Sequence, residues 1–353
     1  MVWNSIQWKE QFEFLSAQRN RKQKEEAKYL LRKMRADVFK HTVILVQQGH
    51  YYNEEQQKIN FPDANMMIAG TRFYESPQTV HHIPTIDHET IVKVENIDCL
   101  LAAEGLLTEG YHPAVLNMAS RRNPGGGVVT GAGAQEENLF RRSNLFQSLY
   151  QFAPFAGEYG LRKSNYQYPL DKNFGGIYTP DAVVFRGTEQ DGYPLLDTPY
   201  RMSFIAVAGI NRPTLESPKR ISSDLVEPVK NKIRTMFRIG LLHGHDSLVL
   251  GALGCGAFRN PPSHIARLFH EVMEEPEFKN KYRLLLFAIL DDHNARLKHN
   301  PEGNFLPFVK EFTETDKNQY GYPLRLSVNL SMALSNKASP VSLLSSLLQS
   351  LIP

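Results

Sequence analysis

Apolar residues recur at helical spacing through the first forty positions of the chain. The recurring positions are Trp8, Phe12, Leu15, Ala27, Leu30, Leu31 and Met34. Spacings of three and four residues are typical of amphipathic helices. The pattern predicts a helical accessory region over residues 1–85. Its last part, about residues 61–87, contains three prolines and is expected to be irregular chain that joins this layer to the main body.

From about residue 92 the pattern changes to short apolar runs that alternate with helical periodicity. Strand-like runs occupy residues 92–94, 114–116, 203–210, 248–250 and 284–290. Helical spacing occurs at 100–107, at Leu139, Leu145, Phe146 and Leu149, at 226–242, and at Ile265, Leu268, Phe269 and Val272. The alternation predicts an α/β core over residues 86–315, with helices covering both faces of its sheet.

The last segment, residues 316–353, is rich in leucine and serine. Leu344, Leu347, Leu348 and Leu351 share one helical side, with serines opposite. We expect an amphipathic helix in this C-terminal extension. It lacks the lysines typical of interfacial membrane helices, which favours docking on its own domain over a membrane or partner role.

Composition and charge narrow the class of protein. The chain has 353 residues, of which 42% are apolar and 22% charged, as in soluble globular proteins. A net charge of +3 is too small to indicate nucleic-acid or membrane binding. The charged segment 19–35 interleaves Glu25 and Glu26 with its basic residues, which favours a solvated helix face over a nucleic-acid patch.

Two cysteines and the N-terminal sequence bear on location. Cys99 and Cys255 match no zinc spacing and favour a reducing compartment. The N-terminus lacks the apolar core of a secretory signal, and no apolar run reaches the roughly 20 residues of a membrane span. These features indicate a cytoplasmic protein that binds no membrane.

A glycine-rich stretch precedes two adjacent acids. Five glycines fall within residues 125–133, and Glu136 and Glu137 follow. Bare backbone before a helix can cradle a diphosphate, because N–H groups approach the anion closely and the helix N-terminus is partly positive. Thr130 and the sequence after Gly131 exclude the Rossmann and P-loop fingerprints. The alternatives are a flexible turn, and acids favoured only by the helix dipole.

A second loop repeats this design. Residues 251–258 follow the apolar run 248–250 and include Gly254, Gly256 and Ala257. Two such loops at the carboxyl ends of strands could hold one diphosphate from both sides. Phe258 would lie at the rim against a ribose or base, or else in the core.

Two other groups of reactive residue types receive no catalytic role. The segment His243-Gly244-His245-Asp246 lies between a helix and a strand, so we interpret it as a polar turn and expect no metal site. Cys255 lies within the second glycine loop, where we expect a small filler rather than a nucleophile.

The two loops and their flanks resemble the bacterial-type poly(ADP-ribose) glycohydrolases, which have a macrodomain fold. The matching segments are 116–124, the triple glycine separated by seven residues from Gln135-Glu136-Glu137, 138–145 and 254–260. The resemblance implies a three-layer α/β/α macrodomain with a mixed central sheet. It also implies hydrolysis of the ribose–ribose O-glycosidic bonds of poly(ADP-ribose) without a metal or cofactor.

The resemblance assigns roles residue by residue. Glu137 matches the catalytic acid/base and Glu136 the neighbour that positions the sugar hydroxyls. Adjacent helical positions diverge by about 100°, so one glutamate is expected to carry both proton transfers. The implied substrate-binding residues are Asn117, Ser120, Gly125, Gly126, Gly127, Gln135, Gly254, Cys255, Gly256, Ala257 and Phe258. Val128, Thr130, Asn138 and Arg142 depart from the family pattern.

Two other functions stay open at this point. One is a macrodomain that binds ADP-ribose without cleaving it. The other is a hydrolase of mono-ADP-ribosyl groups on proteins or nucleic acids. The expected partners are poly(ADP-ribose) or ADP-ribosylated macromolecules, with no dedicated DNA binding, and the oligomeric state cannot be read from the sequence.

Overall fold

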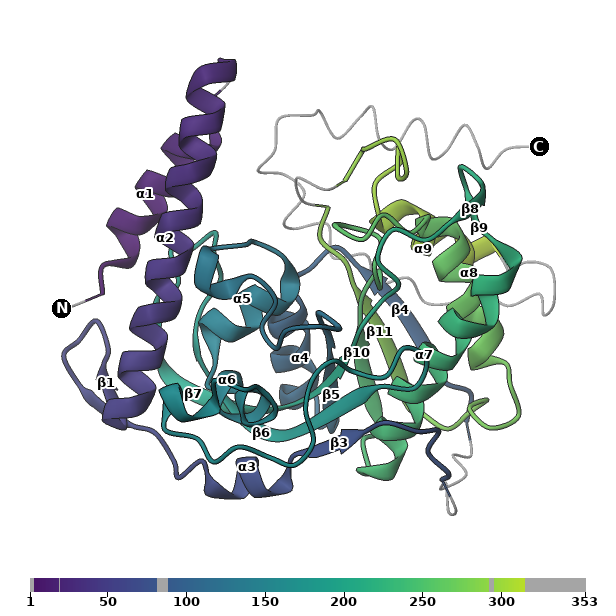
Figure 1. Ribbon diagram of the computed structural model, residues 1–353, viewed down its shortest axis with the longest axis horizontal. Helices are drawn as coiled ribbons and strands as arrows, with labels where there is room; N and C mark the ends of the chain where they lie inside the picture. Colours follow the sequence, from purple (N-terminus) through teal and green to yellow (C-terminus); the bar gives the residue numbers. More distant parts are fainter. Residues whose placement is uncertain (1–2, 19, 81–87, 292–294, 315–353) are drawn as a thin grey trace. The chain divides into compact units, whose positions relative to one another are not determined.

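A seven-stranded sheet forms the centre of the computed structural model, which describes residues 3–18, 20–80, 88–291 and 295–314. The strand order is β3-β6-β7-β5-β10-β11-β4 (Figure 1). The strands are β3 (Arg72–Tyr74), β4 (Ile91–Glu95), β5 (Pro113–Met118), β6 (Gly176–Arg186), β7 (Leu195–Val207), β10 (Ser247–Leu250) and β11 (Leu284–Ala288). The five strands from β7 to β4 are parallel, whereas β6 and β3 are antiparallel to their neighbours.

Helices cover both faces of this sheet. One core cluster joins α4 (Cys99–Thr108), α5 (Gln135–Arg142) and α6 (Leu145–Leu149) to one face. The other joins α7 (Ser223–Leu242), α8 (Pro262–Met273) and α9 (Phe305–Glu314) to the opposite face. Successive residues of β5 alternate between the clusters: Val115 is in the first, and Ala114 and Leu116 are in the second. The predicted three-layer α/β/α class with a mixed sheet is confirmed.

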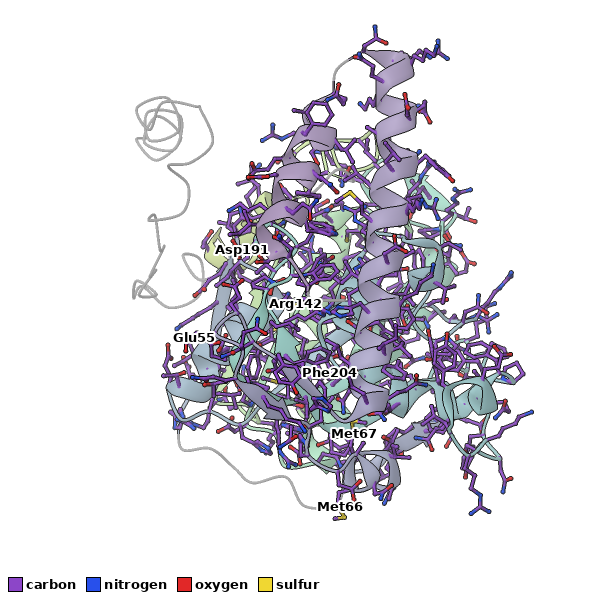
Figure 2. All side chains as sticks on the ribbon, turned by 90° about the vertical axis from the view of Figure 1, so that its left-hand side faces the viewer. Glu55, Met66, Met67, Arg142, Asp191 and Phe204 are labelled. Atoms are coloured by element: carbon purple, nitrogen blue, oxygen red, sulfur yellow. The ribbon has the colours of Figure 1, made fainter. Side chains whose placement is uncertain are left out.

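The periodicity predicted helices in the N-terminal region, and two are present, packed on the α5 side of the body. They are α1 (Ser5–Ser16) and α2 (Arg21–Gln48), each begun by an asparagine whose side chain caps the first turn. Phe39 of α2 is buried among Phe140, Phe146 and Tyr150, with ring centroids 6.1–6.3 Å away. Figure 2 shows α2 standing in front of the body beside α1.

Three local predictions differ from the structure. Within 61–87, expected to be irregular, lie α3 (Asn65–Gly70) and the edge strand β3, while residues 81–87 fall outside the described part. The single helix expected after the glycine loop is broken into α5 and α6. Asn144 causes the break: its N–H donates to the Val183 carbonyl, and its side-chain oxygen accepts from the Val183 N–H. Strand β6 was not predicted at all.

The remaining elements are short. They are β1 (His50–Tyr52) paired with β2 (Lys58–Asn60), β8 (Leu215–Ser217) paired with β9 (Arg220–Ile221), and 3-10 turns at Val128–Thr130, Tyr150–Phe152 and Ala156–Tyr159. The chain up to Glu314 forms one compact unit. The division expected between the accessory region 1–85 and the core 86–315 stays a prediction. The expected C-terminal helix lies outside the described residues. Within the described ranges, no helix combines the length and apolar character needed to cross a bilayer.

Candidate active site

The two glycine loops meet at one edge of the sheet. They follow β5 and β10, which are parallel neighbours, so their carboxyl ends lie together. A pocket opens between them. It is lined by Gly133, Ala134 and Gln135 from the first loop, by Gly254, Gly256, Ala257 and Phe258 from the second, and by Asp98, Asn138, Arg142 and Glu189.

The first loop binds the two acids that follow it. Glu136 accepts hydrogen bonds from the Gly125 N–H (Oε1, 3.0 Å) and the Ser120 N–H (Oε2, 2.6 Å). Glu137 accepts from the Gly127 N–H (Oε1, 2.8 Å) and the Ala134 N–H (Oε2, 3.1 Å). The Gly126 N–H donates within the loop, to Asn123. Two of the three triple-glycine amides thus hold the carboxylates, and the role expected of this loop toward a diphosphate stays a prediction.

The two carboxylates converge on Gly126. Its φ is +54°, and a side chain there would collide with Glu137 Oε1 and lie 3.1 Å from Glu136 Oε2. The helical angle between adjacent residues predicted divergence. Glutamate side chains are long enough to bend toward the same loop, and the Gly125 and Gly127 amides draw them there.

The other two glycines of the first loop serve a different partner. A Cβ at Gly131, where φ is +72°, would collide with the backbone carbonyl of Arg32 in α2. A Cβ at Gly133 would collide with the guanidinium of Arg35. Arg32 also donates to the Thr130 carbonyl (3.1 Å) and hydroxyl (3.2 Å). Close approach of the loop to α2 thus requires these glycines.

We expect Gly131→Ala to lower the free energy of unfolding by more than about 2 kcal/mol. Positive φ costs an alanine about 1–2 kcal/mol, and the collision with α2 adds to it. Urea unfolding measures the change. Gly160 also has a φ of +72° but no atom within 4 Å of an added Cβ, so Gly160→Ala measures the cost of positive φ without a collision. Gly157→Ala, in open space and without positive φ, controls for the substitution itself. Equal losses for Gly131 and Gly160 would contradict a tight contact with α2.

The second loop has the free donors that the triple glycine lacks. The N–H groups of Gly254, Gly256, Ala257 and Phe258 donate to no other described residue. Asn260 fixes the loop by donating to the carbonyls of Ile210 (2.7 Å) and Gly254 (2.9 Å). Consecutive free amides form an anion-binding concavity. This loop is therefore the better diphosphate cradle.

Cys255 and Phe258 occupy this loop differently. Cys255 is fully buried, and burial raises the pKa of its thiol, so a thiolate nucleophile is disfavoured. This agrees with the filler interpretation. Phe258 is only partly buried and lines the pocket, so its ring is available to a ligand.

The Glu136 carboxyl is buried beside a second carboxyl group, that of Glu137. Burial and the charge of Glu137 raise the pKa of the Glu136 carboxyl well above its ordinary value, although the Ser120 and Gly125 N–H groups oppose the shift. Asn117 lies close enough to act on this carboxyl, yet its buried amide has no hydrogen-bond partner within the described ranges. The buried hydroxyl of Tyr168 is also unpartnered there, and Glu136 contributes to its raised pKa. Sugar hydroxyls could satisfy such groups.

Gln135 and Ser120 are engaged with the backbone. The Gln135 side chain accepts from the Met118 N–H (2.9 Å) and donates to the Leu116 carbonyl (2.6 Å). It thereby joins the start of α5 to the end of β5. The Ser120 hydroxyl accepts from the N–H groups of Arg122 and Asn123 at 3.3 and 3.2 Å, which folds the turn before the triple glycine.

Sequence reasoning missed the role of Asp98. Both of its carboxylate oxygens accept from Arg142 Nη1, at 2.8 and 2.9 Å, and Oδ1 also caps α4 through the N–H groups of Leu100 and Leu101. Asp98 and Arg142 line the pocket together with Asn138. An aspartate just before a helical stretch signals an N-cap, but nothing in the sequence joins it to Arg142.

The histidine segment lies at the opposite end of β10, before the strand begins. His245 shares a hydrogen bond with the Tyr178 hydroxyl (2.9 Å), and burial lowers the pKa of His243 and of His245 to about 4. Across the described ranges, no three metal-capable side chains cluster. The structure places these histidines in a packed turn away from the two glycine loops.

The fold and the paired loops define a macrodomain. Residues 40–187 match the family model for the catalytic domain of microbial-type PARG, and no curated protein sequence matches. Poly(ADP-ribose) glycohydrolase from Thermomonospora curvata is 28% identical, with a TM-score of 0.63 over 79% of this chain and 99% of that chain. The enzyme from Deinococcus radiodurans in complex with ADP-ribose is 27% identical, with a TM-score of 0.55 over 73% and 100%. The resemblance to bacterial-type poly(ADP-ribose) glycohydrolases is confirmed.

Proposed function

We propose that this protein is a glycosidase that hydrolyses the ribose–ribose O-glycosidic bonds of poly(ADP-ribose) and releases ADP-ribose. The family match and the ADP-ribose complex of the Deinococcus enzyme support this assignment. One structural observation carries it. Two backbone amides hold the carboxylate of Glu137, which lies in the first turn of α5. Gln135 and Asn138 of the same turn line the pocket together with the second loop.

The arrangement suggests how one ADP-ribosyl unit binds. The diphosphate would accept hydrogen bonds from the free N–H groups of Gly254, Gly256, Ala257 and Phe258. The partly positive N-terminus of α5 would face it. The Phe258 ring would pack against the adjoining sugar or base. The unpartnered Asn117 amide and the Glu136 carboxylate would then bind hydroxyls of the ribose whose bond is cleaved.

Glu137 is the residue we assign to proton transfer. Its carboxyl group would donate a proton to the departing 2′-oxygen as the bond from that oxygen to the anomeric carbon breaks. Water would then attack the anomeric carbon and return a proton to Glu137. The nearby diphosphate and Glu136 would stabilise the positive charge that develops on the ribose ring. Glu136 is held by Ser120 and Gly125 and serves to position the sugar.

Incubation of the purified chain with poly(ADP-ribose) should release free ADP-ribose, detected by anion-exchange chromatography. A mono-ADP-ribosylated protein, assayed in parallel, should release far less. Release from the mono-ADP-ribosylated protein alone would reassign the substrate. Release from neither, with tight ADP-ribose binding by calorimetry, would select a non-catalytic reader and overturn the proposal.

A further inference from the structure

One line of residues runs along α2 from its N-terminus to the body of the protein. Its members, three or four residues apart and therefore on one face, are Arg21, Lys24, Lys28, Arg32, Arg35, Phe39 and Thr42. The C-terminal members contact the site region. Arg35 pairs with Glu189 at 2.7 and 2.8 Å, and the Thr42 hydroxyl donates to the Arg141 carbonyl (2.6 Å).

The N-terminal members of the same line leave the body. Arg21, Lys24, Lys28 and Arg32 are exposed, and the N-terminal half of α2 projects past α5 (Figure 1). Helix α1 packs on another side of α2, where Val38 and Met34 meet Trp8 and Phe12. The four basic residues, named here the α2 basic stripe, are thus not covered by α1.

The charges of the stripe are available to an anion. In the part of the chain that the structure describes, no acidic side chain pairs with Arg21, Lys24 or Lys28. Arg32 donates to Thr130, a neutral residue, and so keeps its charge uncompensated. Glu25 shares this face, four residues after Arg21 and three before Lys28, and it is exposed and forms no ion pair with a described residue. Four cations against one acid leave the row with a net positive charge, which attracts polyanions.

The stripe is anchored at the active site. Arg32 binds Thr130, and the segment from Gly127 to Ala134 that contains Thr130 is closed at both ends by hydrogen bonds to the Glu137 carboxylate. A polymer whose cleaved linkage lies at Glu137 would therefore leave the site beside Arg32. Each further unit of poly(ADP-ribose) carries a diphosphate, and the stripe offers one cation per helical turn, about 5 Å apart.

We propose that the α2 basic stripe binds the diphosphates of poly(ADP-ribose) units that lie beyond the unit held in the pocket. The inference rests on the proposed function and deepens it. The stripe would make long chains better substrates than short ones, while leaving the chemistry at Glu137 unchanged. Its contribution would be electrostatic and would weaken with salt, because bound counterions are released when cations contact a polyanion.

Charge reversal on two faces of the same helix tests the proposal. K24E/K28E changes the stripe, and K22E/K33E makes the same change of charge at exposed positions on another face of α2. ADP-ribose release is measured for long poly(ADP-ribose) and for the ADP-ribose dimer at several salt concentrations. K24E/K28E should lower kcat/KM for long chains about tenfold at low salt and leave the dimer unchanged. K22E/K33E should change both less than twofold.

Several outcomes would overturn the inference. They are equal losses for the two variants, equal losses on the long and short substrates, or a salt dependence identical to that of the unmodified protein. Filter binding of labelled long and short poly(ADP-ribose) provides a readout without turnover. If the unmodified chain releases no ADP-ribose, the proposed function fails, but selective loss of long-chain binding in K24E/K28E would still support the stripe.

Discussion

Glu137→Gln is expected to reduce kcat for ADP-ribose release by about 10²–10⁴-fold. The amide cannot donate a proton to the departing oxygen or accept one from water. The loop should remain in place, because the remaining oxygen can still accept from either Gly127 or Ala134. We therefore expect the Kd for ADP-ribose, measured by calorimetry, to change less than threefold.

The control for this prediction is Glu104→Gln, which removes an exposed acid from α4. It should leave kcat unchanged. Retention of more than a tenth of the unmodified kcat by Glu137→Gln would remove Glu137 from the acid/base role. Loss of ADP-ribose binding together with activity would instead indicate that the carboxylate organises the loop.

The parallel part of the sheet could be predicted because its strands are buried on both faces. Runs such as 114–116, 248–250 and 284–290 are apolar without interruption. The first two lie within strands, and the third contains β11, which ends at Ala288. Strands β3 and β6 lie toward one edge and carry weaker signals. β3 has only three residues, and β6 is interrupted by Pro180 and by Asp181 at φ +49°, where its pairing register shifts.

The glycine loop shows where sequence reasoning stops. Five glycines indicated a backbone that something approaches closely, and this was right. The sequence could not show what approaches. Gly126 faces the carboxylates, whereas Gly131 and Gly133 face α2, which is about a hundred residues away in the chain. Contacts of such separation depend on tertiary packing and leave no local pattern.

The predicted site residues differ in how the structure uses them. Gln135 and Ser120 are bound to nearby backbone, Asn117 is buried and unpartnered, and Phe258 lines the pocket. Their roles toward substrate stay predictions. Arg142 was noted only as a departure from the family pattern, since a buried arginine cannot be recognised until its partner is known.

That partner makes Asp98→Ala the substitution with the largest expected effect on stability. Arg142 is 2% exposed, and its guanidinium would lose a bidentate carboxylate. Removing one member of a buried ion pair costs about 3–5 kcal/mol because a buried charge is left uncompensated. Loss of the α4 N-cap adds about 1 kcal/mol. Urea unfolding should show a loss of at least about 3 kcal/mol.

Asp98→Asn separates the two contributions. The asparagine oxygen can still cap α4, so this variant should be about 1 kcal/mol more stable than Asp98→Ala. Asp37→Ala is the matched control, because the Asp37–Lys40 pair is exposed, with side chains 53% and 71% accessible, and should contribute less than about 0.5 kcal/mol. A loss below about 1 kcal/mol for Asp98→Ala would show that solvent reaches Arg142. The pocket wall beside Asn138 would then be more open than the structure indicates, because a guanidinium that lacks its carboxylate is tolerated only where water can replace it.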